Sequence, residues 1–154
     1  MFNKIDVICI SHIKNNAFSP LIDMYQKRIR WPVNIIALES KLKNPKKCQK
    51  DEAQKIIKHL ENQAVIIALD ERGKNVSSLK FAQQVQNYSR EGHNHLQFII
   101  GGADGLLDEV KDKADILLSF GAQTWPHALA RVMLLEQIYR AQQILSGHPY
   151  HREG

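Results

Sequence analysis

Cysteine is scarce in this sequence. Only Cys9 and Cys48 occur among the 154 residues, and they are not spaced as a C-x-x-C pair. Without a secreted context, two such residues are better interpreted as reduced packing thiols than as a disulfide. Reduced thiols are typical of the cytosol, so we expect the protein to be cytoplasmic.

Long hydrophobic runs are absent as well. No apolar stretch approaches the roughly 20 residues of a membrane span, and residues 1–4 do not open a secretory signal. The chain also lacks internal repeats, low-complexity stretches and linkers. With 154 residues, 44% of them hydrophobic, it suits one ordinary domain. We predict a single domain over residues 1–154 and no membrane partner.

The glycine-rich motifs that bind nucleotide phosphates are missing. The sequence contains no GxxxxGK(S/T) segment, and Gly101, Gly102 and Gly105 do not have GxGxxG spacing. These absences argue against a P-loop nucleotide hydrolase and against a dinucleotide-dependent oxidoreductase.

Histidine pairs do occur, but they lack the further ligands that a metal ion needs. His148 and His151 have no cysteine or carboxylate cluster to complete a coordination shell. His93 and His95 fall at a turn before a predicted strand, and we interpret them as incidental. The sequence therefore predicts no metal site.

The charge balance is basic, with a formal net charge of +5. Such a balance favours a polyanionic partner only modestly, because many ordinary proteins share it. The densest basic run consists of Lys41, Lys43, Lys46, Lys47 and Lys50. This run suits a solvated helix start and a phosphate-contacting surface equally well.

Short β-branched runs alternate with helical patterns along the chain. The predicted strands cover residues 5–10, 33–38, 64–69, 96–100 and 116–119. The predicted helices cover residues 18–30, 46–62, 77–91, 104–114 and 126–146. Several strands read as continuous apolar runs, which is typical of strands covered on both faces. The alternation predicts an α/β fold with a mostly parallel sheet flanked by helices.

Ligands of such sheets gather beyond the carboxyl ends of the strands. Three loops with unusual residues leave predicted strands, at 69–74, 100–105 and 119–126. Taken alone, Gly101-Gly102 is more simply a tight turn than a ligand contact. The stretch 121–126 is too irregular for a strand or a helix. Its free backbone groups suit either a neutral adenine-like base or an ordinary connection.

The last predicted helix carries more apolar surface than one sheet face needs. Pro126 presets its first turn, and Gly147 suits the left-handed residue just past its end. Glu136 and Arg140 are most simply a surface ion pair at i,i+4. Arg131 shares its face with leucines, as a snorkelling or a buried and paired arginine does. We expect the excess apolar surface to form a homodimer interface.

A short tail follows this helix, with the sequence His148-Pro149-Tyr150-His151-Arg152. A solvated terminus normally frays and has no need of such side chains. The tail therefore either sits in a site or plugs the interface between two subunits.

These segments together resemble the SPOUT-class methyltransferases that modify N3 of a pseudouridine in bacterial 23S ribosomal RNA. The matching segments are Leu69-Asp70-x-x-Gly73-Lys74 with Ser77-Ser78, Ile100-Gly101-Gly102-Ala103-Asp104-Gly105, Pro126-His127-x-Leu129-x-Arg131-Val132, Glu136-Gln137-Ile138-Tyr139-Arg140-Ala141 and His148-Pro149-Tyr150-His151-Arg152-Glu153. Each segment alone is weak. In this order, at this spacing and over the whole chain, they are highly specific.

The resemblance implies a C-terminal trefoil knot, S-adenosylmethionine as methyl donor and an obligate homodimer. It also implies a substrate, the 23S rRNA within the assembled 70S ribosome, in the stem-loop that bridges the subunits. The implied cofactor contacts are Leu69, Gly102, Gly121, Ala122, Gln123, Thr124, Trp125 and Pro126. The family commonly has a methionine or leucine, then threonine and an apolar residue, before its Pro-His. Side-chain roles of Gln123 and Trp125 therefore do not carry over.

The tail residues are the candidates for the chemistry. A ring nitrogen must lose its proton before it accepts a methyl group, so the site must stabilise an anion or supply a base. We assign His148, Tyr150 and Arg152 to gripping the flipped base and its phosphate, with His148 as the candidate base. Two alternatives stay open, a non-catalytic ribosome-binding factor and a related enzyme that methylates transfer RNA. The lack of a separate RNA-binding domain favours the ribosome as substrate.

Overall fold

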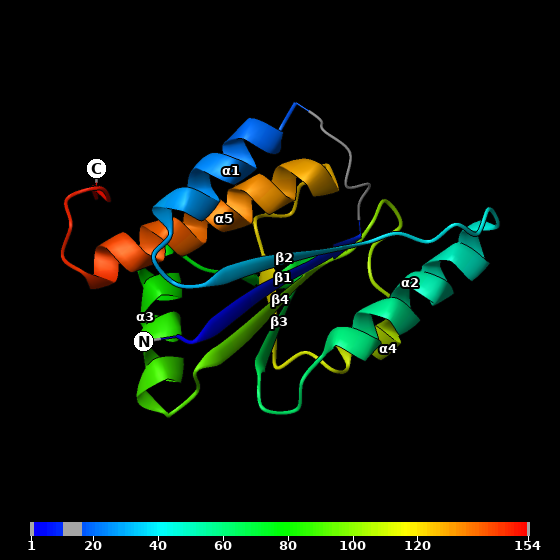
Figure 1. Cartoon of the computed structure of the whole chain (residues 1–154), viewed down its shortest axis with the longest axis horizontal. Coiled ribbons are helices and arrows are strands. Elements are labelled where there is room, and N and C mark those ends of the chain that lie inside the picture. Colours follow the sequence, from blue (N-terminus) through cyan, green and yellow to red (C-terminus); the bar gives the residue numbers. More distant parts are fainter. Residues whose placement is uncertain (1, 11–16, 154) are drawn as a thin grey trace.

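Five parallel strands form a sheet in the order β2-β1-β4-β3-β5 in a computed structural model, which describes residues 2–10 and 17–153 (Figure 1). The strands are β1 (Lys4–Ile10), β2 (Val33–Leu38), β3 (Val65–Asn75), β4 (His95–Ile100) and β5 (Ile116–Ser119). All four strand pairings are parallel. The predicted α/β fold with a parallel sheet is confirmed.

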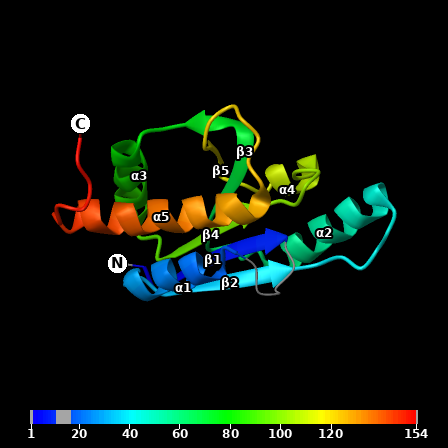
Figure 2. The ribbon, with the colours of Figure 1, turned by 90° about the horizontal axis from the view of Figure 1, so that it is seen from above.

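Helices in the described residues cover both faces of this sheet. They are α1 (Ser19–Arg28), α2 (Pro45–His59), α3 (Ser78–Arg90), α4 (Asp108–Lys111) and α5 (His127–Leu145). α1, α3 and α5 lie on one face, and α2 and α4 lie on the other (Figure 1 and Figure 2). Parallel strands need such crossover connections, because each strand must start again at the same edge of the sheet.

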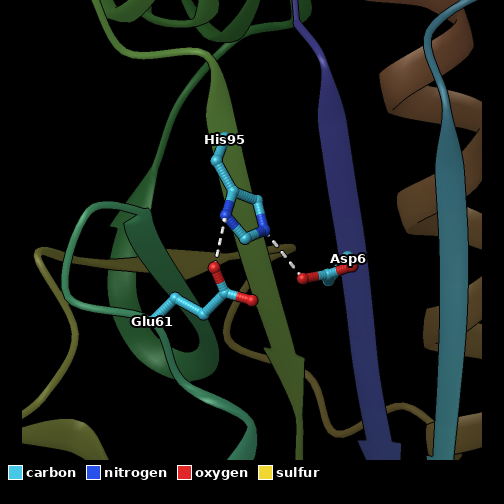
Figure 3. Close-up of side chains that lie close together, drawn as sticks. All are labelled: Asp6, Glu61 and His95. Atoms are coloured by element: carbon cyan, nitrogen blue, oxygen red, sulfur yellow. Dashed lines mark hydrogen bonds and ion pairs between the residues drawn. The ribbon is translucent and has the colours of Figure 1, made fainter.

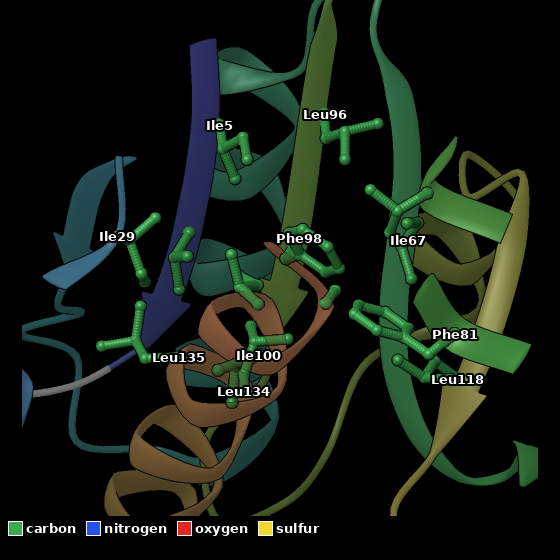
Figure 4. Close-up of a cluster of buried hydrophobic side chains, with 14 of the residues drawn as sticks. Ile5, Ile29, Ile67, Phe81, Leu96, Phe98, Ile100, Leu118, Leu134 and Leu135 are labelled. Atoms are coloured by element: carbon green, nitrogen blue, oxygen red, sulfur yellow. The ribbon is translucent and has the colours of Figure 1, made fainter. Parts of the chain in front are cut away.

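Successive strand residues supply two separate cores. Ile5 and Val7 of β1 pack on the side of α5, whereas Ile8 packs on the side of α2. Figure 4 shows the larger core, which includes Phe98 and Ile100 of β4 and Leu134 of α5. Both faces of the sheet are therefore covered, which explains why the strands read as continuous apolar runs.

β3 runs past its predicted end and takes up the predicted loop at 69–74. After a register irregularity that begins at Leu69, its last residues pair with β5 through Lys74. A Cβ atom on Gly73 would lie 2.6 Å from the carbonyl carbon and oxygen of Leu117. Only a residue without a side chain allows two backbones to approach so closely. The prediction of a loop here is wrong, and Gly73 is a packing glycine of the sheet.

α4 is much shorter than the predicted helix 104–114, since it spans only Asp108–Lys111. Gly105 has a φ of +75°, and an isolated antiparallel bridge joins Gly102 to Gly105. This left-handed residue closes a turn, so the helix can begin only after it.

α5 agrees with the predicted helix within two residues. Pro126 caps its start, and Gly147 has the expected left-handed φ of +75° just past its end. α1 and α3 both pack against α5, and nine of its residues are buried within the single chain. The apolar excess is therefore largely covered inside the molecule, and the expected dimer interface on this helix stays a prediction.

In the part of the chain that the structure describes, no helix is both long enough and apolar enough to cross a membrane. The trefoil knot and the homodimer stay predictions.

Candidate active site

A cavity of about 790 Å³ opens at the carboxyl ends of β3, β4 and β5. The segments 69–72 and 100–106 form much of its wall, and residues between 118 and 130 supply the rest, together with Lys111. The parallel sheet brings these segments together because its strands all end at the same edge. The volume lies within the range of small-molecule sites.

The glycine turn after β4 forms one wall of the cavity. The N–H of Gly105 donates to the carbonyl of Gly102 at 3.0 Å. A Cβ atom on Gly102 would lie 3.1 Å from Cγ2 of Ile10 and 3.5 Å from Oε2 of Glu52, neither of which lines the cavity. A side chain at Gly102 would therefore collide with Ile10 and Glu52 on the side of the turn away from the cavity, and would displace the turn.

The loop after β5 satisfies much of its own polar surface. The hydroxyl of Ser119 accepts the N–H of Gly121 at 3.0 Å, and the indole N–H of Trp125 donates to a carbonyl of the same loop at 3.2 Å. The hydroxyl of Thr124 donates to the carboxylate of Glu71 at 3.0 Å, which ties the loop to the extended end of β3. These bonds fix the shape of the cavity wall.

Charged side chains line one side of the cavity. The ammonium of Lys111 donates to the carboxylate of Asp70 at 2.8 Å. Burial raises the pKa of Asp70, but the bonds from Lys111 and from the N–H of Arg72 outweigh it and hold the pKa below its ordinary value. Asp70 is therefore ionised at neutral pH and presents a carboxylate beside that of Glu71.

Most of the predicted cofactor contacts line this cavity, namely Leu69, Gly102, Thr124, Trp125 and Pro126. The others, Gly121, Ala122 and Gln123, lie in the same loop but away from the cavity wall.

Sequence reasoning missed Lys111 and Ala130, which also line the cavity. Lys111 carries no signal in the sequence, because only the packing of the short helix α4 brings it to Asp70. Ala130 follows the Pro126-His127 motif by one helical turn, and this spacing was the available signal for it.

The tail folds back onto the last turns of α5. The hydroxyl of Tyr150 donates to one carboxylate oxygen of Glu136 at 2.6 Å, and Nε of Arg140 donates to the other at 2.7 Å. The guanidinium of Arg140 also lies 4.7 Å from the ring centre of Tyr150 and reaches Nδ1 of His151 at 3.1 Å. Glu136 and Arg140 are therefore a half-buried pair that anchors the tail, and the prediction of a surface pair is wrong.

The three tail candidates differ in their surroundings. Burial and the hydrogen bond to Glu136 raise the pKa of Tyr150 to about 12, so the phenol keeps its proton at neutral pH. His148 is exposed, and its Nδ1 accepts the N–H of Tyr150 at 3.1 Å. Arg152 is exposed and has no ion-pair partner in the described part of the chain.

Within one chain the tail and the cavity lie at opposite ends of α5 (Figure 2). The helix has 19 residues and is therefore about 28 Å long. His148, Tyr150 and Arg152 consequently do not reach the cavity of their own chain.

Arg131 is buried and poorly compensated. It is 6% exposed, and its Nε and Nη2 have no hydrogen-bond partner in the residues that the structure describes. Burial raises the pKa of the Cys9 thiol, and the nearby positive charge of Arg131 opposes that rise. The sequence allowed either a snorkelling or a buried and paired Arg131. The side chain is buried, but no acidic partner for it is present in the described residues.

His95 is not incidental, which corrects the sequence interpretation. It is buried at the start of β4, with Nε2 2.8 Å from the carboxylate of Asp6 and Nδ1 3.4 Å from that of Glu61 (Figure 3). Each ring nitrogen lies close to a different carboxylate, so the ring links the two acidic side chains. A single metal ion would take only one of these nitrogens. We interpret the cluster as a charge network that compensates the buried Asp6 at the edge of the sheet opposite the cavity.

Comparison with known proteins finds a family model and several relatives that match most of this chain. A family model described as "Predicted SPOUT methyltransferase" matches residues 3–151. A relative from Zymomonas mobilis subsp. mobilis, named Ribosomal RNA large subunit methyltransferase H, is 41% identical over 151 residues and covers 98% of this chain and 99% of its own. A relative of the same name from Rhodospirillum centenum is 44% identical over 133 residues, with 86% and 88% covered.

Among solved structures, this fold is similar to that of the SpoU methyltransferase AviRb from Streptomyces viridochromogenes in complex with the cofactor AdoMet. The TM-score is 0.47 at 13% identity, with 93% of this chain and 58% of that chain covered. The family model and the two relatives span nearly the whole sequence. The chain therefore belongs to the SPOUT methyltransferase family, among the proteins named ribosomal RNA large subunit methyltransferase H.

Proposed function

We propose that this protein is an S-adenosylmethionine-dependent methyltransferase of large-subunit ribosomal RNA. The convergence of the extended end of β3 and of the loops after β4 and β5 on one cavity carries the proposal. The names of the relatives supply the class of RNA. As the specific target we propose N3 of a pseudouridine in 23S rRNA, in the intersubunit-bridge stem-loop of the cytoplasmic 70S ribosome. The order of motifs from residue 69 to residue 153 supports this target.

The residues around the cavity fit S-adenosylmethionine, which supplies an electrophilic methyl group when bound. Leu106 and Leu118 offer apolar surface, and Gly102 and the loop after β5 offer backbone groups for an adenine ring. The carboxylate of Glu71 complements the positive charges of a sulfonium and an amino group, whereas that of Asp70 is already paired with Lys111. Because a sulfonium is itself the electrophile, the proposed chemistry requires no metal.

We propose that the active unit is a homodimer in which the tail of one subunit completes the cavity of its partner. The separation of tail and cavity along α5 supports this arrangement, because the tail does not reach the cavity of its own chain. A two-fold interface would repeat the same contact twice and give two equivalent sites.

The tail residues would then act on the target base. Tyr150 keeps its proton at neutral pH and donates it in a hydrogen bond to Glu136 in the free chain, so to grip the target base its hydroxyl would have to exchange this partner for the base. Arg152 is exposed and suits a charge-assisted bond to the base or its phosphate. His148 is the candidate for the proton acceptor, because it is exposed and imidazole is the side chain that acts most often as a general base.

Methyl transfer to ribosomes tests the proposal. The protein is incubated with labelled S-adenosylmethionine and 70S ribosomes from a strain that lacks the enzyme, and the 23S rRNA is then analysed by mass spectrometry. We expect one added methyl group, on the pseudouridine of the bridging stem-loop. Label in transfer RNA would favour the alternative substrate, and ribosome binding without transfer would favour a non-catalytic factor.

A further inference from the structure

We infer that the basic segment, residues 41–50 at the start of α2, is a phosphate-contacting surface that holds ribosomal RNA beside the cavity. This inference rests on the proposed function and names the surface that the substrate uses. The segment contains Lys41, Lys43, Lys46, Lys47 and Lys50 and no acidic residue. All five lysines are exposed, and none forms an ion pair with another described residue.

The basic segment is fixed to the wall of the cavity. Nε2 of Gln49 donates to the carbonyl of Asp104 at 3.0 Å and lies 3.4 Å from that of Gly105. Both of these residues line the cavity. Lys46, Lys47 and Lys50 therefore stand on a helix that touches the glycine turn, and RNA bound to them would lie next to the cavity.

The acidic side chains close to the lysines are fewer than the lysines. Asp51 pairs with Lys55 at 3.5 Å, whereas Glu52 faces only the thiol of Cys48 at 3.8 Å. Asp104, whose carbonyl accepts from Gln49, is exposed. The carboxylates of Glu52 and Asp104 do not cancel five positive charges, so the surface stays positive.

Helix stability does not explain the lysines. Lys46 and Lys47 lie in the first turn of α2, where the helix dipole disfavours positive charge. The start of the helix is secured by Asn44, whose side chain accepts the N–H of Lys47 at 3.1 Å, and by Pro45. The lysines weaken the helix slightly, and their positive potential suits a polyanion such as an RNA backbone.

The test replaces lysines by glutamine, which removes the positive charge and keeps a long polar side chain. The triple variant Lys46→Gln, Lys47→Gln, Lys50→Gln is compared with a control that loses three exposed lysines elsewhere, Lys27→Gln, Lys58→Gln, Lys80→Gln. Substrates are 70S ribosomes that lack the modification. For the triple variant we expect KM for ribosomes to rise about tenfold or more, with kcat and S-adenosylmethionine affinity unchanged. We also expect the plot of log affinity against log salt to become shallower by about two.

Equal KM and equal salt dependence in the triple variant and the control would overturn the inference. A parallel measurement keeps it separate from the proposed function. If the wild-type protein transfers no methyl group to ribosomes, the proposed function fails, and co-sedimentation with ribosomes still tests the surface. Weaker binding of the triple variant alone supports the surface, and equal binding of all three proteins contradicts it.

Discussion

At the scale of single residues, Tyr150 illustrates how surroundings assign a chemical role. Its ring packs edge-on against Tyr139 with 4.8 Å between ring centres, and its hydroxyl donates to Glu136 at 2.6 Å. Burial and this hydrogen bond raise its pKa to about 12. The sequence alone does not distinguish the role of Tyr150 from those of the other tail residues. Its surroundings make it a hydrogen-bond donor and not a base.

The raised pKa predicts how the docked tail responds to pH. The folded-state pKa of Tyr150 lies above the ordinary value of 10.0, so its contribution to docking is complete below that pH and is lost as pH rises through about 12. We expect a phenolate absorbance step near pH 12 that is present in the wild type and missing from Tyr150→Phe. If the absorbance difference between the wild type and Tyr150→Phe instead showed a phenolate step near the ordinary pKa of 10.0, the packing of the tail would be contradicted.

At the scale of elements, the end of β3 is a place where the backbones of two strands approach closely. Gly73 allows this approach, because a Cβ atom there would lie 2.6 Å from backbone atoms of Leu117. The same stretch carries Asp70 and Glu71 into the cavity wall. The pairing of β3 with β5 therefore supports both the sheet and the charged side of the candidate site.

Gly73→Ala should consequently lower stability. The methyl group would clash with backbone that has no free space, so we expect the free energy of unfolding to fall by about 1–3 kcal/mol. Lys74→Ala, at the exposed neighbouring position, is the matched control and should change it by less than about 0.5 kcal/mol. Urea unfolding of both variants provides the measurement. An unchanged midpoint for Gly73→Ala would show that the two strands do not pack as described.

At the scale of the whole molecule, the main consequence of the fold is the distance between its two functional ends. The cavity lies at the start of α5, and the tail lies past its end, about 28 Å away. The apolar surface of α5 gives little support for a dimer, because α1 and α3 cover it. The separation of the two ends is therefore the stronger argument for a second subunit.

A mixing experiment tests the composite site. Gly102→Val should disable the cavity, and a chain truncated after Gly147 should disable the tail while still binding S-adenosylmethionine. Each variant alone should be inactive on ribosomes. In a mixed dimer, the cavity of the truncated chain and the tail of the Gly102→Val chain form one intact site, and the second site lacks both parts. Half of the randomly formed dimers are mixed, so about a quarter of the wild-type activity should return.

Sedimentation provides the control for this experiment, since each protein should have twice the 17.7 kDa mass of the chain. A monomeric, active protein would rule out the composite site. Full activity of the truncated chain would instead reduce the tail to a structural plug.

The sequence by itself determined the central part of each strand, the parallel sheet and the loops after β4 and β5 that line the cavity. Continuous apolar runs such as 64–69 have one stable environment, a sheet covered on both faces, and parallel strands must end at one edge. The motif order also identified the family before any distance was known.

Only the tertiary structure decided which of these parts meet. The extension of β3 depends on backbone approach at Gly73, and the pairing of Lys111 with Asp70 joins residues 41 positions apart. The buried contact of His95 with Asp6 spans 89 positions. Local patterns record the preferences of neighbouring residues, whereas such contacts exist only after distant segments have packed. The length of α5 then separates the tail from the cavity of its own chain.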